Sequence, residues 1–129
     1  MYMQIAKEAS EVSYCVRRKV GACIVTKEGL LAIGMNGTVP GQENICELPN
    51  GKTSPDTIHA EINALAKLTK EGVSPCGAIL FVTTAPCLEC AKSIAAVGIR
   101  EVHYRDLQTS IAGLEYLVNA GVRHKRYRD

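Results

Sequence analysis

The chain has 129 residues, which suits one domain over 1–129 and leaves too little length for a second independent core. Apolar residues make up 47% and charged residues 22%, the composition of an ordinary globular protein. A formal charge of +2 and 5% aromatic residues argue against a nucleic-acid partner, which usually needs a basic face and stacking side chains.

The first predicted element is a helix over residues 2–14, where Ile5, Ala9 and Val12 recur at helical spacing. Short apolar runs at 21–26 and 30–35 predict two strands joined as a hairpin. Residues 38–57 are rich in Pro, Gly, Asn and Ser, which indicates one long loop. A loop of that length in a compact domain is usually functional or mobile.

The second half alternates strands and helices. We expect a helix near 58–70, a strand at 78–84, a helix opening at Pro86, a strand at 101–104, a helix near 109–120 and a strand near 122–127. Crossover helices of this kind imply parallel strands in this half of the sheet. The sequence therefore predicts an α/β fold, a three-layer α/β/α sandwich around a five-stranded mixed sheet.

No stretch reaches the roughly 18 apolar residues of a membrane span, and the N-terminus lacks the order of a signal peptide. We therefore expect no membrane partner and a cytoplasmic location. In a reducing compartment, the six cysteines are better explained as metal ligands or buried thiols than as disulfides.

Two short segments carry the chemistry, His59-Ala60-Glu61 and Pro86-Cys87-Leu88-Glu89-Cys90. Pro86 suits the first turn of a helix, so Cys87 and Cys90 are expected on one face of that turn, where the positive helix end favours thiolates. His59 would add an imidazole from the neighbouring helix. One imidazole and two thiolates predict a catalytic Zn²⁺ site with its fourth position open.

Glu61 is the predicted base of this site. Its offset of two from His59 directs it to the open position, where it would take a proton from the attacking water and pass protons to the ring nitrogen and the leaving amine. A Cys-x-x-Cys alone could be a redox pair or half of a structural zinc site. A structural site, however, would leave Glu61 unexplained.

With these motifs the chain resembles the deoxycytidylate (dCMP) deaminase family, in the cytidine deaminase-like superfamily. The resemblance spans most of the chain. It rests on Val20–Val25, on the turn Gly34-Met35-Asn36-Gly37, on Thr57–Ala64, on Ala85–Lys92 and on Ala96–Val102.

The resemblance implies hydrolysis of dCMP to dUMP and ammonia, which supplies dUMP for dTMP synthesis, by one catalytic Zn²⁺ per subunit. It implies that Asn36 hydrogen-bonds the nucleoside, and Ala60 and Thr26 are further substrate-contact candidates. The turn formed by Gly34, Met35, Asn36 and Gly37 would bind an allosteric nucleotide. In this family dCTP with Mg²⁺ activates, dTTP inhibits, and the enzyme is commonly a homohexamer.

Three departures from the family pattern matter. Val12 stands where many relatives have Arg, so Arg17 and Arg18 become the phosphate candidates, with solvated surface charges as the alternative. The loop around Cys46 lacks the extra His and Cys of a second zinc site, so Cys15 and Cys46 are expected to be buried free thiols rather than a remnant pair. Met35 replaces the usual Tyr of the turn.

Tyr104, at the carboxyl end of a predicted strand, is a further substrate-contact candidate. Two alternatives to dCMP deamination remain open at this stage. The same zinc chemistry could serve another base, such as cytosine, guanine or tRNA adenosine. A non-catalytic zinc module is the other alternative, and Glu61 separates it from an enzyme.

Overall fold

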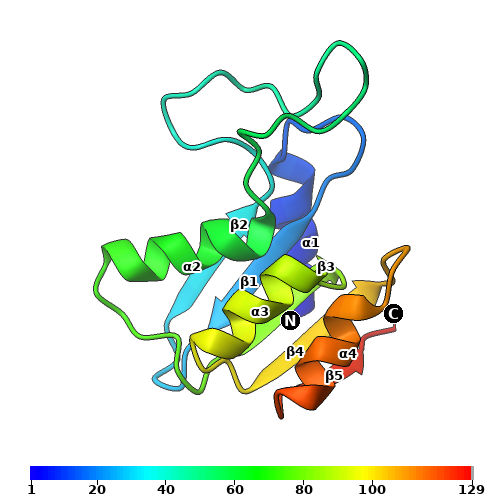
Figure 1. Cartoon of the computed structure of the whole chain (residues 1–129). Coiled ribbons are helices and arrows are strands. Elements are labelled where there is room, and N and C mark those ends of the chain that lie inside the picture. The colour runs from blue at the N-terminus through cyan, green and yellow to red at the C-terminus, as the bar shows by residue number, and fades with distance from the viewer. Residues whose placement is uncertain (129) are drawn as a thin grey trace.

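A computed structural model describes residues 1–128 and confirms the α/β fold (Figure 1). Its elements in chain order are α1 Tyr2–Val12, β1 Gly21–Val25, β2 Leu31–Met35, α2 Ala60–Lys70, β3 Ile79–Thr84, α3 Leu88–Ala96, β4 Glu101–Asp106, α4 Ala112–Asn119 and β5 Arg123–Arg126. The strands form one mixed sheet in the order β2-β1-β3-β4-β5. The strand β1 is antiparallel to both neighbours, whereas β3, β4 and β5 are parallel, as predicted for the second half.

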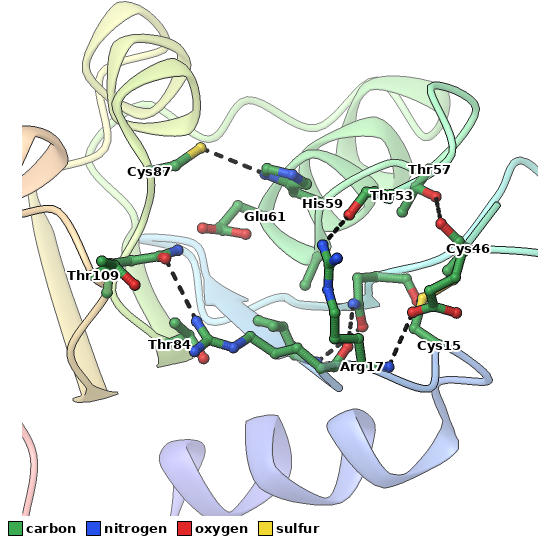
Figure 2. A pocket seen from close by; sticks show the side chains of 16 residues that line it. Cys15, Arg17, Cys46, Thr53, Thr57, His59, Glu61, Thr84, Cys87 and Thr109 are labelled. Carbon is green, nitrogen blue, oxygen red and sulfur yellow. Dashed lines mark hydrogen bonds between the residues drawn. A yellow bond between two sulfur atoms is a disulfide. The ribbon is translucent and has the colours of Figure 1, made fainter. Parts of the chain in front are cut away.

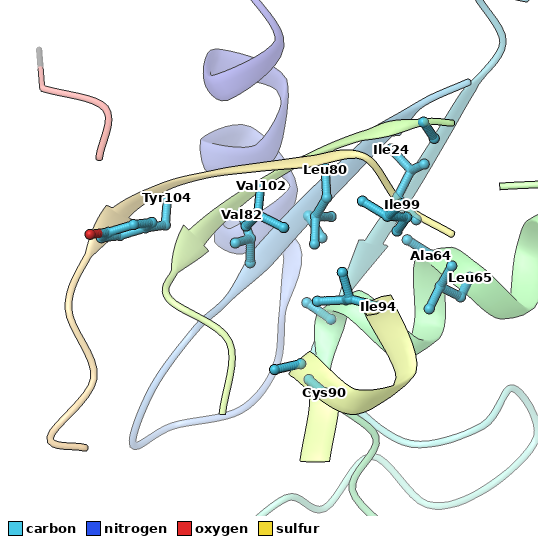
Figure 3. Packing of buried hydrophobic residues seen from close by; sticks show 14 of the residues in the cluster. Ile24, Ala64, Leu65, Leu80, Val82, Cys90, Ile94, Ile99, Val102 and Tyr104 are labelled. Carbon is cyan, nitrogen blue, oxygen red and sulfur yellow. The ribbon is translucent and has the colours of Figure 1, made fainter. Parts of the chain in front are cut away.

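The sheet has helices on both faces, which gives the three predicted layers. Helix α1 covers one face through Met3 and Ala6, which pack with Cys23 of β1. Helices α2, α3 and α4 cover the other face, where most of the core lies (Figure 3). There Ile24 and Leu80 of the strands belong to one buried cluster with side chains of these helices, including Ala64, Leu65, Ile94 and Leu117.

Strand burial follows from this layering. All residues of the interior strand β1 except Val25 are buried, because helices cover both of its faces. The edge strand β2 instead alternates, with Ala32 and Gly34 turned to α2 and Leu31 and Ile33 exposed. A Cβ on Gly34 would lie 2.4 Å from the Ala60 carbonyl oxygen, so only glycine lets the start of α2 approach β2 this closely.

The predicted long loop lies between β2 and α2 and contains no helix or strand of the described chain. Its ends are joined by paired backbone hydrogen bonds between Gly37 and Ile58, of 3.0 Å and 2.6 Å. Figure 1 shows the loop extending beyond the end of the sheet at which α2 begins. Its position beside the start of α2 places it against the segment that carries His59.

Several predicted boundaries are wrong by two or three residues, including the starts of two helices. The helix expected to open at Pro86 begins at Leu88, because Cys87 is its extended N-cap residue, with φ −71° and ψ 171°. The helix expected from residue 109 begins at Ala112. Across residues 1–128, no helix combines the length and apolar character that crossing a bilayer requires.

Candidate active site

The three predicted metal ligands come together at one end of the sheet. His59 is the N-cap residue of α2, and Cys87 is the N-cap residue of α3. Cys90 lies in the first turn of α3 and is buried. Among residues 1–128, these three form the one group of His, Cys, Asp and Glu side chains with metal-binding spacing, with ligand atoms within 4.8 Å of one another.

The spacing of the ligand atoms suits zinc. His59 Nδ1 lies 3.2 Å from Cys90 Sγ and 3.5 Å from Cys87 Sγ. Tetrahedral zinc, with bonds of about 2.1 Å to nitrogen and about 2.3 Å to sulfur, requires a nitrogen-to-sulfur separation of about 3.6 Å. The donor set of one imidazole and two thiols is also that of a catalytic zinc site with an open position.

The three ligand side chains shift one another's pKa values. Hydrogen bonds from Cys90 and His59 lower the pKa of Cys87 to about 3. The hydrogen bond to Cys87, together with burial, raises the pKa of Cys90. The hydrogen bond with Cys87 also raises the pKa of His59. A divalent cation bound here would favour the thiolate form of both sulfurs, which is the form that binds metals.

Glu61 lies next to this group, in the first turn of α2 (Figure 2). Its side chain is only 4% exposed, and burial raises the pKa of its carboxyl to about 7. Glu61, His59 and Cys87 line a cavity of about 500 Å³, a size typical of small-ligand sites. A carboxyl with such a pKa can both accept and give a proton near neutral pH.

Four other predicted site residues line the same cavity: Arg17, Arg18, Asn36 and Ala60. Arg17 donates hydrogen bonds to the Gly51 carbonyl oxygen at 2.7 Å and to Thr53 Oγ1 at 2.6 Å, so its guanidinium is held by the long loop. Arg18 Nη1 donates a longer hydrogen bond, 3.5 Å, to Gln108 Oε1. The two arginines therefore differ in how firmly the protein itself holds them.

Asn36 organises the chain around the cavity. Its Oδ1 accepts hydrogen bonds from Ser13 Oγ at 2.8 Å and from the Val20 amide at 2.9 Å. Its Nδ2 donates to the Arg18 carbonyl oxygen at 2.7 Å. One N–H of the amide is left over for a ligand.

Two substrate-contact predictions need correction. Thr26 follows β1 at the end of the sheet opposite the cavity, because β1 runs antiparallel to β3. There Thr26 Oγ1 accepts a 2.9 Å hydrogen bond from the Leu30 amide and closes the hairpin. Tyr104 is 6% exposed and belongs to the core beneath the helices (Figure 3). Neither residue lines the cavity.

The cavity also contains residues that the sequence reasoning missed. Thr84 ends β3, and Gln108 and Thr109 follow β4. Ligands usually bind at the carboxyl ends of parallel strands, and this rule points to these positions. The sequence prediction applied the rule to Tyr104, which lies within β4, a few residues before the positions that line the cavity. Thr53 and Thr57 of the long loop carry no comparable pattern.

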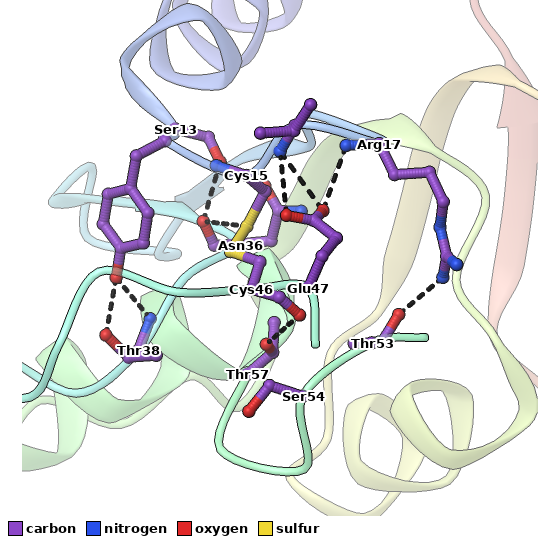
Figure 4. The surroundings of a disulfide bond; sticks show 12 residues. Ser13, Cys15, Arg17, Asn36, Thr38, Cys46, Glu47, Thr53, Ser54 and Thr57 are labelled. Atoms are coloured by element: carbon purple, nitrogen blue, oxygen red, sulfur yellow. Dashed lines mark hydrogen bonds between the residues drawn. A yellow bond between two sulfur atoms is a disulfide. The ribbon is translucent and has the colours of Figure 1, made fainter. Parts of the chain in front are cut away.

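Cys15 and Cys46 form a disulfide, so the expectation of two free thiols is wrong (Figure 4). The bond joins the segment before β1 to the long loop. Next to it, the Glu47 carboxylate accepts hydrogen bonds from the Val16 and Arg17 amides, the shorter of them 3.0 Å. Cys15, Cys46 and Glu47 all line the cavity, so these links fix two of its walls relative to each other.

We predict that the disulfide stabilises the fold measurably. It closes a loop with a sequence separation of 31 residues. Loop-closure entropy then gives about 3–4 kcal/mol of stabilisation. Urea unfolding of a Cys15→Ala, Cys46→Ala double variant should show a loss of that size, and reductant should lower the stability of the wild type but not that of the double variant. Cys76→Ser, at an exposed free cysteine, is the control. An unfolding free energy equal to that of the oxidised wild type would contradict the prediction.

Comparison with known proteins places this geometry in a family. Residues 1–105 match the family model described as the cytidine and deoxycytidylate deaminase zinc-binding region. ComE operon protein 2 of Bacillus subtilis is 39% identical over 114 residues, covering 85% of this chain and 60% of that protein. The deoxycytidylate deaminase of Schizosaccharomyces pombe is 36% identical, covering 98% of this chain and 42% of that protein. The chain thus spans less than two thirds of these two relatives.

A solved structure is similar over almost its whole length. The dCMP deaminase of cyanophage S-TIM5, crystallised in complex with dCMP and dUMP, superposes with a TM-score of 0.93 at 42% identity. The alignment covers 98% of this chain and 93% of that one. The three-layer arrangement and the order of its strands therefore belong to a known fold.

Proposed function

The chain belongs to the deoxycytidylate deaminase family, and from that premise we propose that it converts dCMP and water to dUMP and ammonia. The observation that carries the proposal is the buried Glu61 carboxyl beside His59, Cys87 and Cys90 at the cavity. A non-catalytic zinc module has no need of a buried carboxyl at an open metal position. The S-TIM5 relative, crystallised with dCMP and dUMP, supports the choice of substrate.

His59, Cys87 and Cys90 would hold the zinc ion, which when bound acts as a Lewis acid and makes water more acidic. Glu61 accepts a proton from the attacking water. It delivers that proton to the ring nitrogen, then accepts the second proton from the added hydroxyl and delivers it to the amino group, which leaves as ammonia. The water oxygen ends as the new carbonyl oxygen of dUMP, so atoms balance without an oxidant or a further cofactor. Asn36 offers its remaining N–H to the nucleoside.

We propose Arg18 as the residue that binds the substrate phosphate, and Arg17 as an anchor of the long loop. Arg17 already donates two short hydrogen bonds to that loop, whereas Arg18 has one long bond to Gln108. A phosphate oxygen is a stronger acceptor for a guanidinium than a neutral amide. The phosphate would therefore displace Gln108 as the partner of Arg18.

The test is a substrate panel in which released ammonia is measured. We predict turnover of dCMP, and a KM for dCMP about 10–100-fold higher in Arg18→Ala, the loss expected for a hydrogen bond to a charged group. Deoxycytidine, which has no phosphate, should react equally poorly with both proteins. Arg100→Ala, at the opposite end of β4, is the matched control. Turnover of cytosine, guanine or adenosine in place of dCMP would overturn the proposal.

We further propose that dCTP with Mg²⁺ activates the enzyme and dTTP inhibits it at the turn Gly34–Gly37. Asn63 Nδ2 donates a 2.6 Å hydrogen bond to the Met35 carbonyl oxygen, and Gly34 packs against Ala60. Both contacts are with the first turn of α2, which carries Glu61. A nucleotide that shifts this turn would therefore act on the catalytic helix. Feeding dUMP into dTMP synthesis would account for opposing control by these two nucleotides.

We predict that, at dCMP concentrations below KM, dCTP with Mg²⁺ raises the deamination rate and dTTP lowers it. Rates that respond to neither nucleotide would rule out this regulation.

Light scattering tests the homohexamer, which stays a prediction from the family. The cytoplasmic location also stays a prediction. Thiol labelling of the protein in cells tests it, because a Cys15–Cys46 disulfide is uncommon in a reducing compartment.

A further inference from the structure

The backbone of the ligand Cys87 rests on a helix that supplies no ligand. Cys87 is an extended N-cap residue with no side-chain capping hydrogen bond, and its carbonyl oxygen accepts a 2.9 Å hydrogen bond from the Ala91 amide of α3. A second helix, α4, also packs against this backbone, and its buried residue Gly113 faces Pro86 and Cys87. Leu114, the next residue of α4, shares the buried cluster with Cys90.

Gly113 makes this contact possible because it has no side chain. A Cβ at this position would lie 2.1 Å from the Pro86 carbonyl oxygen. It would also lie 2.9 Å from the Cys87 carbonyl carbon and 3.0 Å from the Cys87 carbonyl oxygen. All three are backbone atoms, which cannot rotate away as the end of a side chain can. Any side chain at 113 must therefore displace the ligand's own backbone or push α4 away from α3.

We propose that Gly113 is a positioning residue of the metal centre, through which α4 sets the location of the Cys87 thiolate. The inference rests on the proposed zinc site, but not on the identity of the substrate. Gly113 lies outside residues 1–105, the part of the chain that matches the zinc-binding family model. The residues that position the metal ligands therefore extend beyond the matched segment into the C-terminal part of the chain.

A side chain added at 113 would change metal binding by displacing the backbone of Cys87. Residues that orient a metal ligand without touching the metal typically change metal affinity by about 10–100-fold when mutated. His59 is the N-cap residue of α2, and the three atoms nearest to a Cβ at 113 belong to Pro86 and Cys87, so we expect His59 to keep its position. The expected defect is a weakened bond to one thiolate, not a general loss of the site.

The test compares Gly113→Ala with Gly21→Ala. Gly21 is a matched control, because a Cβ there would lie 2.0 Å from the Ala6 carbonyl oxygen, a similar clash on the opposite face of the sheet. We expect zinc release to a colorimetric chelator to be about tenfold faster or more in Gly113→Ala than in Gly21→Ala. The Co²⁺-substituted protein should show altered thiolate-to-cobalt absorption in Gly113→Ala only. Equal release rates and unchanged spectra in both variants would overturn the proposal.

If Gly113→Ala does not fold, Leu117→Ala gives a second test. Leu117 is a fully buried core residue of α4, and its truncation loosens the helix without adding atoms near Cys87. The matched control is Met3→Ala, which truncates a buried side chain of α1. Faster zinc release from Leu117→Ala than from Met3→Ala supports the inference, and equal release contradicts it. A wild type that binds zinc but does not deaminate dCMP refutes the proposed function and leaves this inference standing.

Discussion

Glu61→Gln should retain zinc and lose about 10²–10⁴-fold in kcat, the contribution that a positioned general acid–base residue typically makes. The amide has nearly the shape of the buried carboxyl, so the cavity should keep its form. It cannot accept the proton from water or return it to the leaving amine. Zinc content by atomic absorption and ammonia release under saturating dCMP measure the two effects separately.

Glu89→Gln is the matched control for Glu61→Gln. Glu89 is in the first turn of α3, next to the ligand Cys90, but its side chain is 81% exposed and pairs with Lys92. The same chemical change there should leave kcat within about twofold, as exposed charges contribute little. A Glu61→Gln protein with wild-type turnover would show that another group is the base.

The pH profile offers an independent check on Glu61. A base works in its deprotonated form, so kcat/KM should fall as the pH drops through the pKa of Glu61. Burial raises that pKa to about 7, and a nearby cation would lower it. The midpoint of the fall in kcat/KM on the acidic side should therefore be at or below about pH 7.

The fold and the metal ligands were predictable because each depends on short-range patterns. The helical spacing of Ile5, Ala9 and Val12 predicted the helix α1, although only Ala9 of the three is buried. The alternation of strands and helices after the long loop predicted the parallel half of the sheet. His59, Glu61 and the two cysteines lie within two short motifs at helix starts. Such motifs keep their meaning without knowledge of the rest of the chain.

The remaining site residues depend on how distant segments meet, which no local pattern encodes. Thr26 was wrongly placed because the direction of β1 in the sheet puts its first residue, not its last, at the catalytic end. The Cys15–Cys46 bond required the loop to fold back through the Gly37–Ile58 pairing. The clash at Gly113 becomes visible only once α4 lies on α3.

Removal of one ligand is expected to have the largest effect on the metal. Cys87→Ala should lower zinc affinity by about 10²–10³-fold, because four-ligand zinc sites bind with about 10–16 kcal/mol, or about 2.5–4 kcal/mol for each ligand. Cys87 is only half-buried at the edge of the core, so the variant should still fold. Deamination should fall in proportion to bound zinc, and excess Zn²⁺ should restore part of it. Competition with a chelator of known affinity measures the change.

Cys23→Ala separates loss of a ligand from loss of a thiol. Cys23 is fully buried in β1 on the α1 side of the sheet, and burial raises its pKa to about 11, so it stays a neutral thiol. Its removal should cost stability through lost packing and leave zinc affinity unchanged. If Cys87→Ala bound zinc as tightly as Cys23→Ala, the three-ligand assignment would fail. The zinc would then be bound without Cys87, and its proposed position beside Glu61 would lose its physical basis.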